Sequence, residues 1–288
     1  MEQKRLKTAI IGIGRWGKNV ARELADQSEL VAFVSHGSAE NEAWATSSIP
    51  SAQKLTLEEV CVSKDIQVVA VATPIATHAE IVRALLAGGK HVLCEKPLAE
   101  TAVTAFELAT LAKEHSLILA TGYVYLYHPT YQELKKNVVG QKISRVEFVW
   151  KKHGTFKETI ELNLLTHHLA LALDLMGKPE SGKILRCEAH ETACDIIETK
   201  LTYPSCEVIS LIDRVSQEKT HTMTVHADGK VYVWEGTQLR DSRGLFSERD
   251  MPLAREVSAF LESVGGGPVP QTAGDFGAHV LELHEMLR

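Results

Sequence analysis

Residues 8–17 read TAIIGIGRWG, a short apolar run that leads into a G-x-G-x-x-G motif. Residues 8–13 have the composition of a buried strand, and residues 18–26 have the pattern of a helix. In such a turn Gly12 permits the tight bend, Gly14 lets the backbone approach a pyrophosphate, and Gly17 allows the helix to pack closely on the strand. The motif predicts a dinucleotide-binding turn that includes Arg15 and Trp16, although a glycine-rich turn that binds nothing looks the same.

The alternation of strand and helix continues over the first third of the chain. Strand-like and helix-like segments follow one another at 30–34, 68–72, 78–87, 91–94, 102–114 and 117–120. Strands that alternate with helices are typical of a parallel sheet covered on both faces. We expect an N-terminal Rossmann domain, a doubly wound parallel sheet, over residues 1–122.

The pattern changes after Pro129 to a series of strands interrupted by few helices. Strands are expected at 143–150, 183–190, 194–203, 207–215, 220–226 and 230–235, and helices at 131–136, 162–176, 253–264 and 275–287. Asp228-Gly229 is a strong hairpin signal, because glycine supplies the positive φ of a two-residue turn. The overall class is therefore α/β, with a second α+β domain over residues 123–288 built on an open, mainly antiparallel sheet.

Composition narrows the class of function. The net charge is −6 over 288 residues and basic residues are scattered, which argues against a nucleic-acid partner. No apolar run approaches the roughly 20 residues that span a bilayer. The five cysteines form no C-x-x-C pair, and the thirteen histidines show no metal-ligand spacing. We expect a cytoplasmic protein with reduced thiols, no metal site and no membrane anchor.

The end of the second predicted strand bears on the choice between NADP and NAD. An acidic residue at this place usually binds the adenine ribose, but residues 34–38 read VSHGS and contain no carboxylate. Ser35, His36 and Ser38 could instead donate hydrogen bonds to a 2′-phosphate. The pattern favours NADP, while Glu40 is the residue that could reach back to bind NAD.

Two further strand ends carry polar residues to the same edge of the predicted sheet. Thr73-Pro74 follows one strand, with His78 at the start of the next helix, and Glu95-Lys96-Pro97 follows another. Ligands bind at the carboxyl edge of such sheets. A lysine there can exchange a proton with a carbinol oxygen as hydride leaves carbon. A surface Glu-Lys pair before a turn is the alternative.

The glycine motif, Thr73-Pro74 with His78, the stretch AGGKHVLCEKPLA at 87–99 and the helix from Pro252 to Phe260 together resemble the glucose-fructose oxidoreductase/inositol dehydrogenase (Gfo/Idh/MocA) family. The resemblance implies a Rossmann domain, a C-terminal domain with an open antiparallel sheet, and a homodimer or homotetramer formed through that sheet. It also implies that Lys96 is a catalytic residue that contacts the substrate. From their place at the sheet edge, Thr73, Pro74, His78, Glu95 and Lys96 are candidates for cofactor binding, and Glu95 could position the lysine ammonium group.

In this family a helix of the second domain carries an Asp and, four residues later, an acid–base His. The matching stretch gives His167 the catalytic position and puts Asn163 where the Asp would be. Asn cannot stabilise an imidazolium as a carboxylate does. His168 or Glu161 could compensate, or Lys96 could act alone. Without the resemblance, a histidine on such an apolar helix is more often a core residue.

The crossing between the expected domains is rich in tyrosine, and Tyr123 and Tyr125 are candidates for substrate contact, with packing as the alternative. The sequence as a whole predicts an NAD(P)-dependent oxidoreductase acting on the carbinol or keto carbon of a small sugar, nucleotide sugar or polyol. Two other readings stay open. One is a non-catalytic dinucleotide-binding sensor or inactive subunit, and the other is a reductase of a non-sugar substrate.

Overall fold

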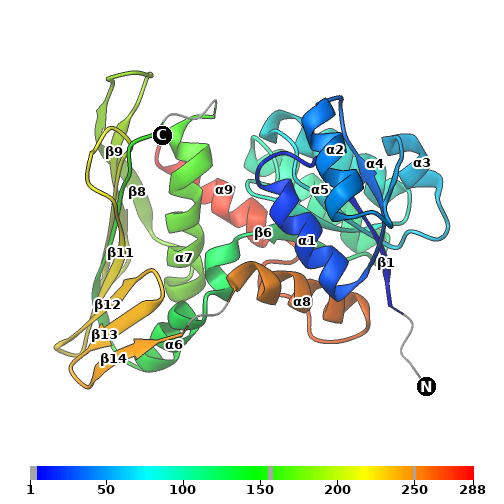
Figure 1. Ribbon diagram of the computed structural model, residues 1–288. Coiled ribbons are helices and arrows are strands. Elements are labelled where there is room, and N and C mark those ends of the chain that lie inside the picture. The colour runs from blue at the N-terminus through cyan, green and yellow to red at the C-terminus, as the bar shows by residue number, and fades with distance from the viewer. Residues whose placement is uncertain (1–4, 155–157, 249–250) are drawn as a thin grey trace. The chain divides into compact units, whose positions relative to one another are not determined.

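The computed structural model describes residues 5–154, 158–248 and 251–288 (Figure 1). The chain forms two compact units. The first comprises the residues up to Tyr123 together with Leu253–His279, and the second comprises Val124–Pro252 together with Val280–Arg288. Each unit has its own sheet and its own buried core.

The first unit contains a six-stranded parallel sheet in the order β3-β2-β1-β4-β5-β6. This is the strand order of a doubly wound dinucleotide-binding fold. Successive strands are added on one side of β1 up to β3, and from β4 onward they are added on its other side. Its strands are β1 Lys7–Ile11, β2 Glu29–Val34, β3 Gln53–Lys54, β4 Val68–Val71, β5 His91–Glu95 and β6 Leu119–Gly122. The Rossmann architecture predicted from the sequence is confirmed.

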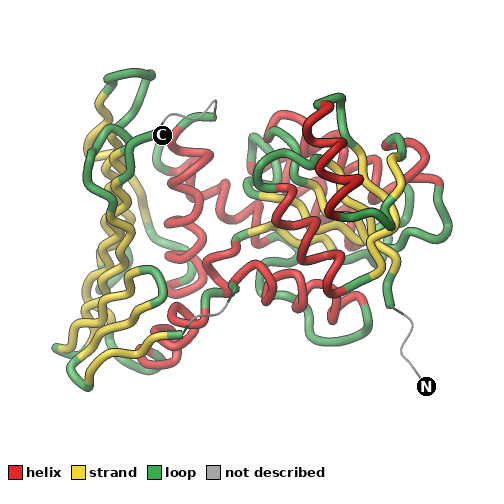
Figure 2. The backbone as a smooth tube through the Cα atoms, viewed as in Figure 1, coloured by secondary structure: helices red, strands yellow, loops and turns green. Residues whose placement is uncertain are grey.

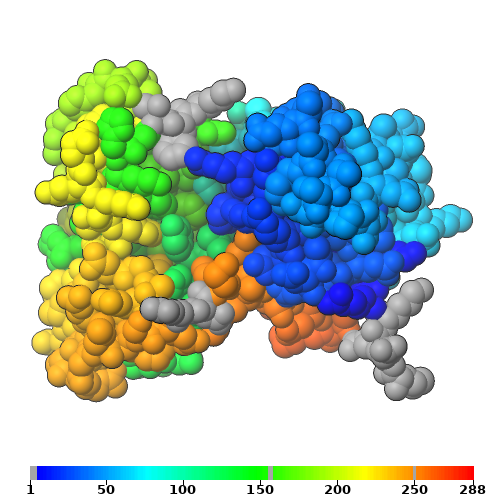
Figure 3. All heavy atoms as spheres, viewed as in Figure 1, coloured from blue at the N-terminus to red at the C-terminus, as the bar shows by residue number. Residues whose placement is uncertain are grey.

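The helices of the first unit connect these strands in sequence. They are α1 Gly17–Gln27, α2 Ala39–Ser48, α3 Leu57–Val62, α4 His78–Ala87 and α5 Ala102–Glu114, with a short helical turn at Ile75–Thr77. The atoms of α1 and α2, drawn in blue, lie on the face of this unit that is turned toward the viewer in Figure 3. The sequence predicted α4 and α5 with correct bounds but missed α2, α3 and the two-residue β3.

A later segment of the chain also packs in the first unit. Helix α8 spans Pro252–Val264, and Gln27 donates a hydrogen bond of 3.1 Å to the Ala254 carbonyl. Farther on, Ala273 forms a β-bridge with Ala120 of β6. The sequence predicted two continuous domains, with residues 253–279 in the second. The structure groups these residues with the first unit. The local sequence pattern of 253–279 does not indicate which sheet the segment packs on.

The second unit is built on an eight-stranded sheet in the order β14-β13-β12-β11-β7-β10-β9-β8. Its strands are β7 Ile143–Lys151, β8 Ser181–Glu188, β9 Ile196–Thr202, β10 Glu207–Asp213, β11 Thr220–Ala227, β12 Lys230–Glu235, β13 Gln238–Asp241 and β14 Gly244–Ser247. The Asp228-Gly229 hairpin joins β11 and β12, with φ of 45° and 74° at its two residues. The sheet is mainly antiparallel, as predicted, but β10 pairs with β7 in parallel, and β13 and β14 were missed.

Helices α6 (Pro129–Val138) and α7 (Thr166–Met176) belong to the second unit, with single helical turns at Val124–Tyr127 and Glu161–Leu165. Figure 2 shows α7 alongside one face of the sheet. The helix expected at 162–176 begins with a π-helical turn at Glu161–Leu165, a wider winding that is frequent at functional sites. Helix α9, Phe276–Met286, continues the chain into its final residues.

Two cysteines differ from expectation. Cys187 and Cys194 form a disulfide, with their Cα atoms 5.7 Å apart, so the prediction of reduced thiols is wrong for this pair. The antiparallel pairing of β8 with β9 brings together two residues that lie seven apart in the sequence. Cys61, Cys94 and Cys206 are free thiols.

A buried ion pair holds the connection between β8 and β9. The carboxylate of Asp195 is fully buried. The Arg214 guanidinium donates a hydrogen bond of 2.9 Å to one of its oxygens. The other oxygen accepts hydrogen bonds from the backbone N–H groups of His190, Glu191 and Thr192. These donors hold the pKa of Asp195 well below its usual range, against the opposing effect of burial.

We expect Asp195→Ala to lower the free energy of unfolding by about 3–5 kcal/mol, because it leaves Arg214 buried without its anion. Since the pKa of Asp195 is lowered by folding, its contribution is present at neutral pH and is lost as pH falls below the ordinary range of a carboxyl group. Urea denaturation at several pH values measures both effects. The control is Glu107→Ala, which breaks the exposed pair with Arg83 and should cost less than about 1 kcal/mol. Equal losses in the two variants would contradict this account.

Candidate functional site

The three glycines of the motif differ in the space around them in the turn between β1 and α1. Gly12 has a φ of 91°, and a Cβ on it would lie 2.5 Å from the Ala72 carbonyl oxygen. A Cβ on Gly17 would lie 2.0 Å from the Gly12 carbonyl oxygen. Both positions therefore need glycine for the turn itself. A Cβ on Gly14 would meet nothing within 4 Å, so this glycine leaves space beside the helix N-terminus where an anion is favoured.

The loop after β4 is tied to the loop after β5 by His78, whose side chain is buried. Its Nε2 lies 2.9 Å from the Thr73 carbonyl oxygen, and its Nδ1 lies 2.8 Å from the Pro97 carbonyl oxygen. The Thr77 hydroxyl donates to the Thr73 hydroxyl at 2.8 Å. These two ring contacts hold together the two loops that carry other candidate residues, while contact between His78 and the cofactor stays a prediction.

Glu95 and Lys96 lie at the end of β5, on the same edge of the sheet as the glycine turn. The indole N–H of Trp16 donates a hydrogen bond to Glu95 Oε1, and the Lys96 backbone N–H donates to Glu95 Oε2 at 3.3 Å. Burial raises the pKa of Glu95 to about 7, against the lowering effects of Trp16 and Lys96. A dinucleotide turn, an ionisable carboxyl and a lysine are thus brought together in one unit.

The residues after β2 form an exposed turn. Gly37 has a φ of 89°, and the Ser38 hydroxyl accepts a hydrogen bond from the Asn41 backbone N–H at 3.3 Å, which caps α2. Ser35 and His36 precede this cap, and Arg15 is exposed in the glycine turn. Ser38 therefore has a structural partner, whereas the part of Ser35, His36 and Arg15 in cofactor binding stays a prediction.

In the second unit His167 packs among aromatic rings. Its ring lies edge-on to Tyr125, with centroids 4.9 Å apart, and 5.7 Å from the ring of Trp150. The side chain is buried, and Asn163 lies one turn earlier, in the π-helical segment. Tyr125 and His167 are therefore neighbours, and Asn163 lies in the same unit.

The adjacent His168 belongs to the core. Its ring stacks on Phe148 at 4.7 Å, and its Nδ1 lies 2.5 Å from the Ser210 hydroxyl. Burial holds the pKa of His168 well below its usual range, so the imidazole is neutral. The structure thus gives His168 a packing role, while its compensation for Asn163 stays a prediction.

Two aromatic neighbours of Tyr125 were not singled out from the sequence. His221 of β11 stacks on Trp150 of β7 with centroids 4.1 Å apart, and Trp234 of β12 lies 6.1 Å from Tyr125. The β7–β11 register places Trp150 opposite His221, on the face that also buries Phe148 and Met223. Burial lowers the pKa of His221 to about 4, with a smaller effect from His128. The alternation of large residues along 146–150 and 221–225 was the signal that could have found this face.

Two further predictions concern Tyr123 and the joint action of Lys96 and His167. Tyr123 belongs to the first unit, where it is 1% exposed and packs edge-on against Phe276. Substrate contact by Tyr123 stays a prediction, as does the shared action of Lys96 and His167, which belong to different units. Within the described residues no group of three His, Cys, Asp or Glu side chains could hold a metal ion.

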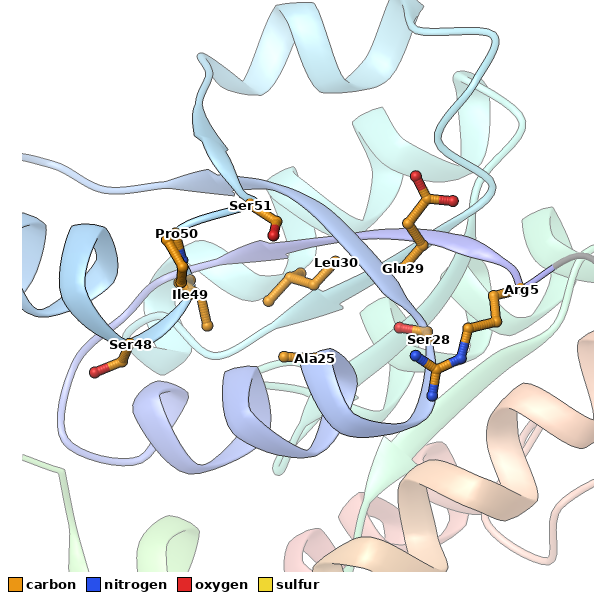
Figure 4. A pocket seen from close by; sticks show the side chains of 9 residues that line it. All are labelled: Arg5, Ala25, Ser28, Glu29, Leu30, Ser48, Ile49, Pro50 and Ser51. Carbon is orange, nitrogen blue, oxygen red and sulfur yellow. The ribbon is translucent and has the colours of Figure 1, made fainter.

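A hollow in the first unit lies away from these residues. It is lined by Arg5, Ala25, Ser28, Glu29, Leu30, Ser48, Ile49, Pro50 and Ser51 (Figure 4). Arg5 precedes β1 and Glu29 begins β2, so this hollow lies at the amino edge of the sheet, opposite the glycine turn. The edge that carries the candidate site is the other one, where ligands of such sheets bind.

Comparison with known proteins gives relatives for both units. Residues 6–123 match the model of an oxidoreductase family with an NAD-binding Rossmann fold, GFO_IDH_MocA. Human biliverdin reductase A is 28% identical over 147 residues, which cover 49% of this chain and 47% of that protein. UDP-N-acetylglucosamine 3-dehydrogenase from Acidithiobacillus ferrooxidans is 26% identical over 229 residues, which cover 76% of this chain and 71% of that protein. The chain thus spans about half the length of the reductase that it matches.

Solved structures extend the similarity to almost the whole fold. A structure of the same Acidithiobacillus dehydrogenase has a TM-score of 0.91 at 21% identity and covers 99% of this chain and 97% of that one. Biliverdin reductase from Synechocystis, solved with biliverdin and NADP+, has a TM-score of 0.82 at 18% identity and covers 96% of each chain. At these identities the similarity concerns the fold of both units. None of the helices in the described part of the chain is long and apolar enough to cross a membrane.

We expect Gly14→Ala to raise the Kd for NADPH at least about tenfold while changing the free energy of unfolding by less than about 0.5 kcal/mol. The reason is that its new methyl group meets no protein atom but occupies the space needed by a pyrophosphate. Fluorescence titration and urea denaturation measure the two quantities. Gly12→Ala is the matched control, since strain at its positive φ should destabilise the fold. Unchanged NADPH affinity in a folded Gly14→Ala protein would rule out this role of Gly14.

Proposed function

Because the chain belongs to the Gfo/Idh/MocA oxidoreductase family, we propose that it is an NAD(P)-dependent dehydrogenase or reductase. The reaction is hydride transfer between the nicotinamide and a carbinol or keto carbon of a sugar, nucleotide sugar or polyol. The observation that carries the proposal is the common edge of the Rossmann sheet, where the Gly12–Gly17 turn, Thr73-Pro74 and Glu95-Lys96 meet. The Acidithiobacillus relative, a UDP-N-acetylglucosamine 3-dehydrogenase, supports a nucleotide-sugar substrate.

Lys96 is the residue that moves a proton in this proposal. In the oxidative direction Lys96 Nζ accepts the hydroxyl proton of the carbinol as the hydride leaves its carbon. In the reductive direction Lys96 returns that proton to the new alkoxide. Glu95, which accepts a hydrogen bond from the Lys96 backbone, fixes the peptide from which the lysine side chain extends. The dinucleotide, when bound, supplies or accepts the hydride.

His167 orients the substrate hydroxyl in this proposal. Its ring neighbours Tyr125 and Trp150 carry no charge at neutral pH, and burial raises the pKa of Tyr125 to about 12. Asn163 replaces the family Asp and cannot supply an anion. Because position 163 offers no carboxylate to an imidazolium, we assign His167 a hydrogen-bonding role toward the substrate hydroxyl.

Two other functions have a specific observation in their favour. The missing carboxylate at Asn163 favours a dinucleotide-binding sensor or inactive subunit, which would bind NADPH and never oxidise it. The similarity to biliverdin reductases favours a reductase of a non-sugar substrate. Incubation of the protein and NADPH with a panel of keto sugars, nucleotide keto sugars and a linear tetrapyrrole distinguishes the three functions. Consumption of NADPH with sugars only supports the sugar oxidoreductase, and consumption with the tetrapyrrole only supports the non-sugar reductase. No consumption with any compound supports the sensor or inactive subunit.

We further propose a homodimer or homotetramer formed through the sheet of the second unit. On the face of that sheet opposite α7, Val149 of β7 lies beside Leu211 of β10, and Ile209 lies on the same strand face. An apolar patch on an open sheet face is typical of a subunit interface. The proposed location is the cytoplasm, although the Cys187–Cys194 bond is more typical of an oxidising compartment.

We expect Lys96→Met to lower kcat by at least about a hundredfold, because general acid–base catalysis typically contributes that much. The Kd for NADPH should change little, since the glycine turn is intact. Steady-state kinetics with the substrate identified from the panel, together with NADPH titration, provide the test. Turnover close to that of the wild type would exclude Lys96 as the proton-transferring residue. Lys113→Met, in the last turn of α5, removes the same charge away from the sheet edge and serves as the control.

The proposal of NADP as the preferred cofactor predicts the effect of a new carboxylate at the end of β2. Ser35→Asp should weaken NADPH binding and strengthen NADH binding, because the new carboxylate repels a 2′-phosphate and accepts hydrogen bonds from a ribose 2′-hydroxyl. We expect the ratio of the two Kd values to shift by at least about tenfold toward NADH. Ser35→Asn keeps the size without the charge. Equal shifts in Asp and Asn variants would show that charge at position 35 does not select the cofactor.

A further inference from the structure

The hydrogen bond between Trp16 and Glu95 crosses the edge of the sheet on which the proposed function depends. Trp16 lies in the turn after β1, and Glu95 ends β5, with β4 between these two strands. Neighbouring strands lie about 4.8 Å apart, so the contact links backbones separated by about 10 Å. The Trp16 side chain therefore extends over the end of β4, the part of the edge between the glycine turn and Lys96.

Glu95 joins two different parts of the site. One carboxylate oxygen accepts the indole N–H of Trp16, and the other accepts the backbone N–H of Lys96 at 3.3 Å. Gly122 of the neighbouring strand β6 makes room for this carboxyl, since a Cβ on Gly122 would lie 3.0 Å from Glu95 Oε1. A movement of the glycine turn is consequently transmitted to the peptide of Lys96 through one side chain.

The titratable groups around Glu95 come from three elements. Cys94 is its neighbour on β5, Tyr123 follows β6, and Glu256 of α8 is 1% exposed. Burial raises the pKa of each of these three acids and so favours their neutral forms. Lys96 is the positive charge that acts on Glu95. The charge of Glu95 changes near neutral pH, because its pKa is about 7.

We propose that Trp16 and Glu95 form a latch, which closes when Glu95 is ionised and through which the glycine turn positions Lys96. Both groups that face the Glu95 oxygens are N–H donors, and a carboxylate accepts such bonds more strongly than a carboxylic acid does. Above neutrality the latch holds the glycine turn and the Lys96 peptide together. Below neutrality Glu95 is protonated, and Trp16 is released from it. Glu95 is thus a positioning residue; its effect on turnover rests on the proposed function of Lys96, whereas the latch itself does not.

The test uses the protein alone, without cofactor or substrate, so its failure is distinct from failure of the proposed function. The chain has four tryptophans, and the difference in fluorescence between wild type and Trp16→Phe isolates the signal of Trp16. We expect this signal to titrate with a midpoint near pH 7 and the transition to be lost in Glu95→Gln. Glu256→Gln is the control, because burial raises the pKa of Glu256 and favours its neutral form, and the titration of this variant should match that of the wild type. A Trp16 signal that is flat from pH 5.5 to 8.5, or a transition that persists in Glu95→Gln, would overturn the latch.

Thermal unfolding gives a second measurement that does not depend on the Glu95→Gln protein. The pKa of Glu95 is raised on folding, so the native state loses stability as pH rises from the ordinary carboxyl range toward 7. Trp16→Phe removes the hydrogen bond that lowers this pKa. The fall in Tm should therefore extend to higher pH in Trp16→Phe than in the wild type. Superimposable curves of Tm against pH for the two proteins would contradict the proposed link.

Discussion

The close approach of α1 to β1 is the contact on which the candidate site depends. A Cβ on Gly17 would lie 2.0 Å from the Gly12 carbonyl oxygen, and a Cβ on Gly12 would lie 2.5 Å from the Ala72 carbonyl oxygen. The helix can therefore begin directly above the strand end only if both residues are glycine. This packing directs the helix N-terminus toward the carboxyl edge of the sheet and leaves Gly14 beside open space. The parallel strands β4 and β5 then bring Thr73 and Lys96 to the same edge.

Charge is unevenly distributed over the candidate residues of the two units. In the second unit His168 and His221 are neutral because burial lowers the pKa of both, and aromatic rings surround His167. In the first unit Glu95 and Lys96 provide ionisable groups at the sheet edge, and burial raises the pKa of the nearby Glu256. This contrast gives a physical reason why proton transfer is assigned to Lys96 and why an Asn at position 163 is compatible with a chemically competent site.

Local pattern and strand direction were sufficient to predict most of the first unit. The glycine spacing and the run of strand ends predicted one edge carrying Gly14, Thr73 and Lys96, because parallel strands all end on the same side. Contacts between distant segments were not predictable in this way. The parallel pairing of β10 with β7, the stacking of His221 on Trp150 and the Cys187–Cys194 bond all depend on strand register, which one sequence does not specify. The Trp16–Glu95 hydrogen bond likewise joins residues 79 apart in the chain.

The central claim is that the carboxyl edge between the glycine turn and Lys96 is where the dinucleotide lies. A crystal structure of the protein grown with NADP+ tests this most directly. The account predicts the pyrophosphate over Gly14 at the start of α1 and the nicotinamide ring beside Lys96, with Trp16 in contact with the cofactor. A dinucleotide bound at the amino edge of the sheet, in the hollow lined by Arg5 and Ser28, or none bound at millimolar concentration, would contradict it.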